Sequence, residues 1–106
     1  MNKTGKAVIL MMDSFGIGGA EDAAKFNDAG ANTLGHIIQT RKKLNIPNLT
    51  ALGLLQAAED SCAIKLQPGP QSPARIQMPS KYGFMKEISR GKDTSSGHWE
   101  MAGCPV

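Results

Sequence analysis

The chain begins with a continuous apolar run that ends at an acidic residue. Residues 6–12 hold one lysine and then Ala-Val-Ile-Leu-Met-Met, and Asp13 follows directly. Apolar side chains that do not alternate with polar ones indicate a strand buried on both faces, as in the parallel sheet of an α/β fold. Ligand sites in open α/β sheets form outside the carboxyl ends of the strands. Asp13 therefore lies where a functional residue is expected.

A glycine-rich loop and several helical patterns follow this predicted strand. Residues 14–19 read Ser-Phe-Gly-Ile-Gly-Gly, and such glycines allow the backbone to turn tightly and approach a ligand. Asn32 or Thr33 is expected to N-cap a helix whose apolar residues recur at helical spacing. The other expected elements are a short helix over 20–26, a short helix or turn over 48–55 and a strand over 62–66.

The second half of the sequence is less regular. Residues 68–79 contain four of the six prolines, which predicts a surface loop rather than a core element. Residues 81–89 fit either one face of a helix or an alternating strand, and the pattern does not decide between them. A hydroxyl cluster, Thr94-Ser-Ser96, precedes Gly97 and indicates the start of a helix.

Charge and aromatic content bear on the kind of partner. The 106 residues carry 12 Lys+Arg and 9 Asp+Glu, and the whole excess of +3 lies in residues 61–106. This placement suits a small phosphorylated ligand. A nucleic-acid-binding protein is expected to show a denser basic stripe with stacking aromatics, whereas one Trp, one Tyr and three Phe are scattered here. We therefore predict no nucleic-acid partner.

The apolar segments and the cysteines predict a cytoplasmic protein with no membrane partner. No apolar run is long enough to cross a bilayer, and the six apolar residues before Asp13 are too few for a signal peptide. Cys62 and Cys104 form no CxxC motif, so reduced thiols are expected.

Two phosphate-binding motifs are nearly present, and both fail. Gly16-Ile-Gly18 starts a G-x-G-x-x-G pattern, but Glu21 stands at the third glycine position. Gly91-Lys92 resembles the end of a P-loop, but Asp93 follows where that motif needs Ser or Thr. The sequence therefore supports neither a Rossmann site nor a Walker loop.

Asp13 and the hydroxyl cluster Thr94-Ser-Ser96 remain as candidates for a shared metal site. A hydroxyl group is a poor nucleophile at neutral pH and needs a base or a metal ion to become reactive. A carboxylate oxygen and a hydroxyl oxygen suit the same hard cation. A phosphate on the hydroxyl would be stabilised by the free N–H groups at the helix start. Each residue also has a purely structural reading, since Asp often forms turns and Thr often caps helices.

Four blocks of sequence, in this order, resemble the amino-terminal part of the bacterial phosphopentomutases, a family of the alkaline phosphatase superfamily. The blocks are Met12-Asp-Ser-Phe-Gly-Ile-Gly18, Ala31-Asn-Thr-Leu-Gly-His-Ile37, Pro47-Asn-Leu-Thr-Ala-Leu-Gly-Leu54 and Gly91-Lys-Asp-Thr-Ser-Ser-Gly-His-Trp-Glu100. The last block is the most distinctive.

The resemblance implies a fold and a reaction. It implies an α/β core with a mostly parallel sheet and two manganese ions, and a cap domain inserted into that core. The family interconverts ribose 1-phosphate and ribose 5-phosphate, and the 2-deoxyribose pair. Asp13 would be a manganese ligand, and Thr94 would be both a metal ligand and the residue that carries phosphate. Phospho-Thr94 would donate to a pentose phosphate, and the resulting sugar bisphosphate would serve as activator.

The resemblance also predicts an incomplete domain. Residues 1–106 would form the amino-terminal portion of the metal-binding core, with the cap and the remaining metal ligands beyond them. We expect this portion to be inactive and marginally stable or aggregation-prone by itself. Two other readings stay open: another enzyme of the superfamily, such as a phosphoglycerate mutase or a phosphatase, and a non-catalytic phosphate-binding module.

Overall fold

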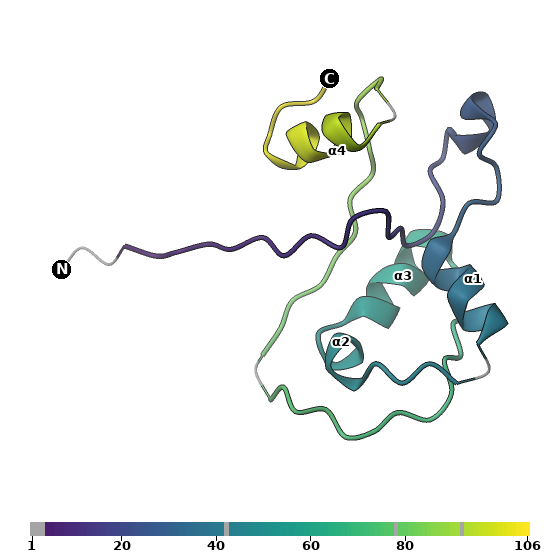
Figure 1. Ribbon diagram of the computed structural model, residues 1–106, viewed down its shortest axis with the longest axis vertical. Helices are drawn as coiled ribbons and strands as arrows, with labels where there is room; N and C mark the ends of the chain where they lie inside the picture. The colour runs from purple at the N-terminus through teal and green to yellow at the C-terminus, as the bar shows by residue number, and fades with distance from the viewer. Residues whose placement is uncertain (1–3, 42, 78, 92) are drawn as a thin grey trace.

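The computed structural model describes residues 4–41, 43–77, 79–91 and 93–106, and its regular elements in these ranges are helices. The elements are the 3-10 helix η1 (Ala23–Phe26) and the helices α1 (Thr33–Thr40), α2 (Pro47–Ala51), α3 (Leu54–Cys62) and α4 (Thr94–Met101). Figure 1 shows α1, α2 and α3 together on one side of the molecule and α4 apart from them. None of the helices in the described ranges is long and apolar enough to span a membrane.

The start of α1 is built by Asn32, as the sequence predicts. Its side-chain oxygen accepts hydrogen bonds from the N–H of Gly35 at 3.1 Å and from that of Gly18 at 3.0 Å. The first bond caps the helix, and the second fastens the glycine-rich loop to it. A Cβ atom at position 35 would lie 2.4 Å from the Asn32 amide nitrogen, so this cap requires glycine there.

A small core joins α1 to α3. Leu34, Ile38 and Ala58 are buried against one another. Partly buried apolar side chains surround them, namely Phe15, Ile17, Leu44, Leu54, Leu55 and Leu66. The radius of gyration is 15.8 Å, whereas a compact domain of this length has about 13 Å. The chain is therefore more expanded than a closed domain, which accords with its small core.

The proline-rich stretch is a loop, as predicted, and it runs around α2 (Figure 1). Polar side chains attach it to the preceding part of the chain. Gln71 accepts a bond from the N–H of Ile46 at 2.8 Å, and Asn48 accepts one from the N–H of Arg75 at 2.8 Å. One residue of this stretch, Met78, lies outside the described residues.

The predicted buried strand over residues 6–12 is absent from the structure. The described part of the chain contains no strand, and this segment is extended but exposed, with Val8 at 79%, Ile9 at 75% and Leu10 at 90% exposure. Figure 1 shows it running out from the helices to the N-terminus. A strand exists only where a neighbour pairs with its backbone groups, so the parallel sheet is not confirmed here.

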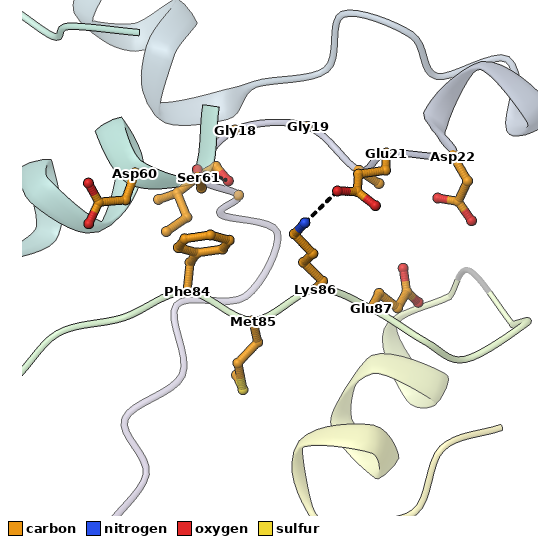
Figure 2. A pocket seen from close by; sticks show the side chains of 13 residues that line it. Gly18, Gly19, Glu21, Asp22, Asp60, Ser61, Phe84, Met85, Lys86 and Glu87 are labelled. Atoms are coloured by element: carbon orange, nitrogen blue, oxygen red, sulfur yellow. Dashed lines mark hydrogen bonds and ion pairs between the residues drawn. The ribbon is translucent and has the colours of Figure 1, made fainter. Parts of the chain in front are cut away.

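Two further predictions of secondary structure are corrected. Residues 62–66 are not a strand, because α3 continues to Cys62 and the backbone then turns at Ala63, which has a left-handed φ of 54°. Residues 81–89 form neither a helix nor a strand. In this segment Phe84 and Lys86 point to one side and Met85 to the other (Figure 2), as side chains do in a strand. The described residues contain no neighbouring strand with which it could pair. The short helix expected over residues 20–26 is the shorter η1.

Candidate functional site

Asp13 lies at the end of the extended amino-terminal segment. One of its carboxylate oxygens accepts a hydrogen bond from the N–H of Ser14 at 2.9 Å. Ser14 has a φ of 59°, so the chain turns sharply directly after the aspartate. The side chain of Asp13 is exposed, and its carboxylate is accessible to a ligand.

Thr94 is the first residue of α4, and Asp93 caps this helix. The carboxylate of Asp93 accepts a hydrogen bond from the N–H of Ser96 at 2.7 Å. This bond, together with one from the Ser96 side chain, holds the pKa of Asp93 below its ordinary value. The sequence predicted a helix start near Gly97 with the hydroxyl cluster as its cap, whereas the helix begins at Thr94 and includes the cluster. Asp93 makes the stronger cap because its charge also faces the positive end of the helix dipole.

The three hydroxyl groups at this helix start differ in accessibility. Thr94 and Ser95 are exposed, whereas Ser96 is buried, with 6% of its surface exposed. A Cβ atom on Gly91 would lie 2.3 Å from the Ser96 hydroxyl oxygen, so this side chain packs against the Gly91 backbone. Ser96 is therefore enclosed within the structure, and Thr94 and Ser95 are the hydroxyl groups that a substrate can reach.

One pocket of about 860 Å³ contains both Asp13 and Thr94. Its walls are the turn after the extended segment, residues 85–88 and one side of α4. The two candidate residues are far apart in the sequence, and tertiary structure brings them to one surface. A shared cation would need both residues at one surface, and their roles as metal ligands stay predictions.

Two further polar residues of α4 lie in this pocket, and the sequence did not single out either for a role there. His98 lines it, and also lines a neighbouring hollow of about 440 Å³ together with Asp13. Glu100 lines the larger pocket as well. His98 lies four residues after Thr94 and so on the same face of the helix, which was the available signal for it, whereas the spacing of Glu100 gave none.

The oxygen atoms of Asp13 and Thr94 are of a type that binds metal ions, but two residues are too few for a complete site. Carboxylate and hydroxyl oxygens are ligands that hard divalent cations such as manganese prefer. Within the described ranges, however, no group of three or more His, Cys, Asp or Glu side chains is placed to hold a metal ion. Asp13 and Thr94 thus fit as part of a coordination shell and do not make a complete one.

A second pocket, of about 510 Å³, lies between the glycine-rich loop and residues 84–87 (Figure 2). Neither Asp13 nor Thr94 lines it. Lys86 crosses it to form an ion pair with Glu21, and both side chains are largely exposed. Exposed pairs of this kind contribute little to stability. The loop itself is used for packing: Gly16 accepts a bond from the N–H of Leu34 at 3.1 Å, and a Cβ on Gly18 would lie 2.5 Å from the Ser61 hydroxyl oxygen.

Residues 5–89 match the metalloenzyme superfamily. The chain belongs to this superfamily. The match covers Asp13 and ends before α4, so it includes two walls of the larger pocket, the turn after the extended segment and residues 85–88, and not Thr94. A comparison with solved structures found none that match.

Among curated proteins the chain is similar to phosphopentomutases, which confirms the resemblance seen in the sequence. It is 63% identical to the phosphopentomutase of Elusimicrobium minutum over 95% of this chain and 25% of that protein. It is 54% identical to the one from Actinobacillus succinogenes, over 95% of this chain and 25% of that protein. For Aeromonas salmonicida the identity is 51% over 95% of this chain and 26% of that protein. The chain spans about a quarter of the length of these relatives.

Proposed function

We propose that this chain is part of a phosphopentomutase, an isomerase that interconverts ribose 1-phosphate and ribose 5-phosphate and the corresponding 2-deoxyribose phosphates. The observation that carries the proposal is the pocket that Asp13 and Thr94 share. The phosphopentomutases that are similar over 95% of the chain support the choice of reaction. The pentose phosphate is the substrate, and a sugar bisphosphate activates the enzyme by supplying its first phosphate.

Thr94 is the proposed carrier of the phosphoryl group. Phospho-Thr94 gives its phosphoryl group to the free hydroxyl of a pentose phosphate, so a bond from phosphorus to the Thr94 oxygen breaks and one to the sugar oxygen forms. The bisphosphate then returns its other phosphoryl group to Thr94 and leaves as the isomer. The position of Thr94 at the start of α4 supports this role, because the positive end of the helix dipole stabilises a phosphate dianion.

Asp13 and Thr94 are the proposed manganese ligands of this chain. Two manganese ions are proposed for the complete enzyme, and such paired ions lie roughly 3.5–4 Å apart and need several protein ligands. Further ligands must therefore come from residues other than the described ones. When bound, the ions would favour ionisation of a nearby hydroxyl and neutralise phosphoryl charge. Asp13, which is held by the Ser14 N–H at the turn, presents its carboxylate to the same pocket.

A cytoplasmic location is proposed with this function. Cys62 and Cys104 are free thiols, which suits a reducing compartment. Other enzymes of the superfamily that move or release phosphate, such as phosphoglycerate mutases and phosphatases, would use Asp13 and Thr94 in the same way. Substrate choice separates these alternatives, and so the assay must include their substrates.

The test uses the protein as expressed from its own gene. With manganese and a sugar bisphosphate, we expect the wild type to convert ribose 1-phosphate to ribose 5-phosphate and to carry phosphate on Thr94. Thr94→Ala should lower the rate by at least about 1000-fold, because the covalent step is lost. Ser95→Ala is the matched control and should keep both activity and covalent phosphate, since Ser95 is the neighbouring exposed hydroxyl.

The outcomes separate the readings. Covalent phosphate found by mass spectrometry on the Thr94→Ala protein would show that another residue is the nucleophile. Turnover of a phosphoglycerate with none of a pentose phosphate would assign the chain to the rival mutase. A protein that turns over no phosphate ester, under conditions where manganese binds, would overturn the enzymatic proposal.

A further inference from the structure

Glu100, near the end of α4, uses both carboxylate oxygens to hold the segment that precedes the helix. One oxygen accepts a hydrogen bond from the N–H of Ile88 at 2.7 Å, and the other accepts one from the N–H of Ser89 at 3.0 Å. The two donors are adjacent in the chain, so the carboxylate meets them as a pair. Hydrogen bonds to a charged acceptor are about twice as strong as those between neutral groups.

The same segment contacts the first turn of α4. Gly91 packs so closely against Ser96 that no Cβ atom fits between them. Ser89 is 4% exposed, and its hydroxyl oxygen accepts a bond from the N–H of Val106 at 2.9 Å. Residues 88–91 therefore hold α4 near its beginning and near its end, and they also hold the chain that follows it.

Polar contacts, rather than apolar burial, set the place of this helix. Ser96 is the one residue of α4 that is buried, and Trp99 on the same helix is 61% exposed. Apolar contacts are not directional. Two hydrogen bonds to neighbouring N–H groups are directional, so they fix both the rotation of the helix about its axis and its position along that axis. Thr94 lies on this helix, and its position opposite Asp13 depends on the same constraint.

We propose that Glu100 is a positioning residue, which holds α4 so that the Thr94 hydroxyl faces the pocket it shares with Asp13. This inference rests on the proposed function, since it concerns the group that carries phosphate. Glu100 lines the pocket as a carboxylate, but both of its oxygens point to backbone donors of residues 88 and 89. These two bonds give it a role in orienting the helix.

Electrostatics alone predicts that neutralising Glu100 speeds the reaction, whereas a positioning role predicts that it slows the reaction. This difference makes the inference testable. The pocket would hold a phosphoryl group, and a carboxylate in it repels that negative charge. If charge were the only role of Glu100, the neutral isostere Glu100→Gln would speed the reaction. If Glu100 positions α4, the same change removes one acceptor, places an amide donor against a backbone donor and slows the reaction.

The experiment compares Glu100→Gln and Glu100→Ala with Glu59→Gln in the protein as expressed from its own gene. Glu59 is a matched control because its carboxylate also accepts a backbone hydrogen bond, from Leu66 at 3.0 Å, but lies on α3 and lines neither pocket. The measurements are kcat and KM for ribose 1-phosphate, the manganese concentration for half-maximal rate, and hydrogen exchange of the Ile88 and Ser89 amides without substrate.

We expect kcat to fall by about 10-fold or more in Glu100→Gln and further in Glu100→Ala, because small misplacements of a reacting group cost rates of this order. KM should change by less than about twofold, as for an interaction that matters for the transition state alone. The Ile88 and Ser89 amides should exchange faster in Glu100→Gln. Glu59→Gln should leave kcat and these amides unchanged. Should Glu100→Ala fail to fold, Glu100→Gln and the amide exchange decide the question.

Three results would overturn the inference. An unchanged or raised kcat in Glu100→Gln would show that the anchor does not matter for the reaction. A changed manganese requirement with unchanged amide exchange would make Glu100 a metal ligand instead. An equal loss of kcat in Glu59→Gln would show that the loss in Glu100→Gln comes from general destabilisation of the fold. Failure of the proposed function looks different, since the unsubstituted protein would then have no mutase activity to lose.

Discussion

Single residues at the ends of structural segments carry most of the chemistry in this chain. Asp13 ends the extended amino-terminal segment, and Thr94 begins α4. Such positions leave backbone groups unpaired and side chains accessible, so they are places where ligands bind. A carboxylate after an apolar run and a hydroxyl cluster at a helix start are local patterns, so the sequence indicated Asp13 and residues 94–96, and the family resemblance then singled out Thr94. Their shared pocket was only a hypothesis at that stage.

The role of Asp13 can be tested by removing its charge without changing its shape. Asp13→Asn should weaken manganese binding by at least about 10-fold, because even the loss of an outer partner of a metal ligand has an effect of this size. Calorimetric titration of the protein with manganese measures it. Asp60→Asn, which removes another exposed carboxylate outside the larger pocket, should bind manganese as the wild type does. Equal affinity in Asp13→Asn and the wild type would exclude Asp13 as a ligand.

At the level of whole elements, the starts of α1 and α2 agree with the local sequence, whereas other helix ends depend on contacts from elsewhere. Asn32 caps α1 and Pro47 is the first residue of α2, as its fixed φ favours. The end of α3 was misjudged, since residues 62–66 look like a strand when read alone. In the structure, Glu59 of α3 accepts a hydrogen bond from the N–H of Leu66, which folds this segment back along the helix.

The bond to Glu59 predicts a local dependence on pH. The Leu66 N–H and, to a smaller extent, the Lys65 ammonium hold the pKa of Glu59 below its ordinary value of 4.5. A carboxyl group with a lowered pKa stabilises the folded form above its unfolded pKa, and this contribution is lost as the pH falls through the lower, folded value. The Leu66 amide should therefore lose protection from hydrogen exchange on acidification below pH 4.5.

Two variants give this prediction its controls. In Glu59→Gln the Leu66 amide should show no such acid-dependent loss, because the side chain no longer titrates. Lys65→Met should behave nearly as the wild type, since the Lys65 side chain is 88% exposed and its ion pair is screened by solvent. Protection of Leu66 that stays constant above and below pH 4.5 in the wild type would contradict the role of Glu59.

On the scale of the molecule, the chain exposes apolar surface that its own helices do not cover. Val8, Ile9 and Leu10 are each at least 75% exposed, and they lie next to one another in an extended segment. Extended apolar segments with unpaired backbone groups promote association between chains. We predict that residues 1–106 alone self-associate at micromolar concentration, and that the double substitution Val8→Lys, Leu10→Lys makes them more soluble.

In a longer protein in which this segment is a buried strand, the same double substitution should be harmful rather than beneficial, because it lowers the stability of the fold. There it should destabilise folding by about 1.5–3 kcal/mol for each side chain, the value of its lost burial. Sedimentation velocity of the short chain and denaturant unfolding of the protein as expressed from its own gene measure the two effects. A monomeric short chain, or a longer protein of unchanged stability, would contradict the respective prediction.

The local features of this protein follow from its sequence alone. The Asn32 cap and the proline-rich loop each depend on a few neighbouring residues, whose preferred φ, ψ and hydrogen bonds hold in almost any context. The family, too, could be read from four short blocks, because they keep their order.

Tertiary structure decided everything that joins distant parts of the chain. It placed Asp13 and Thr94 in one pocket, directed Glu100 to the backbone of residues 88 and 89, and left the first apolar run exposed where the sequence predicted burial. The physical reason is the same in each case: burial and long-range hydrogen bonds depend on which partner segment is present, and a residue's own neighbours carry no information about that partner.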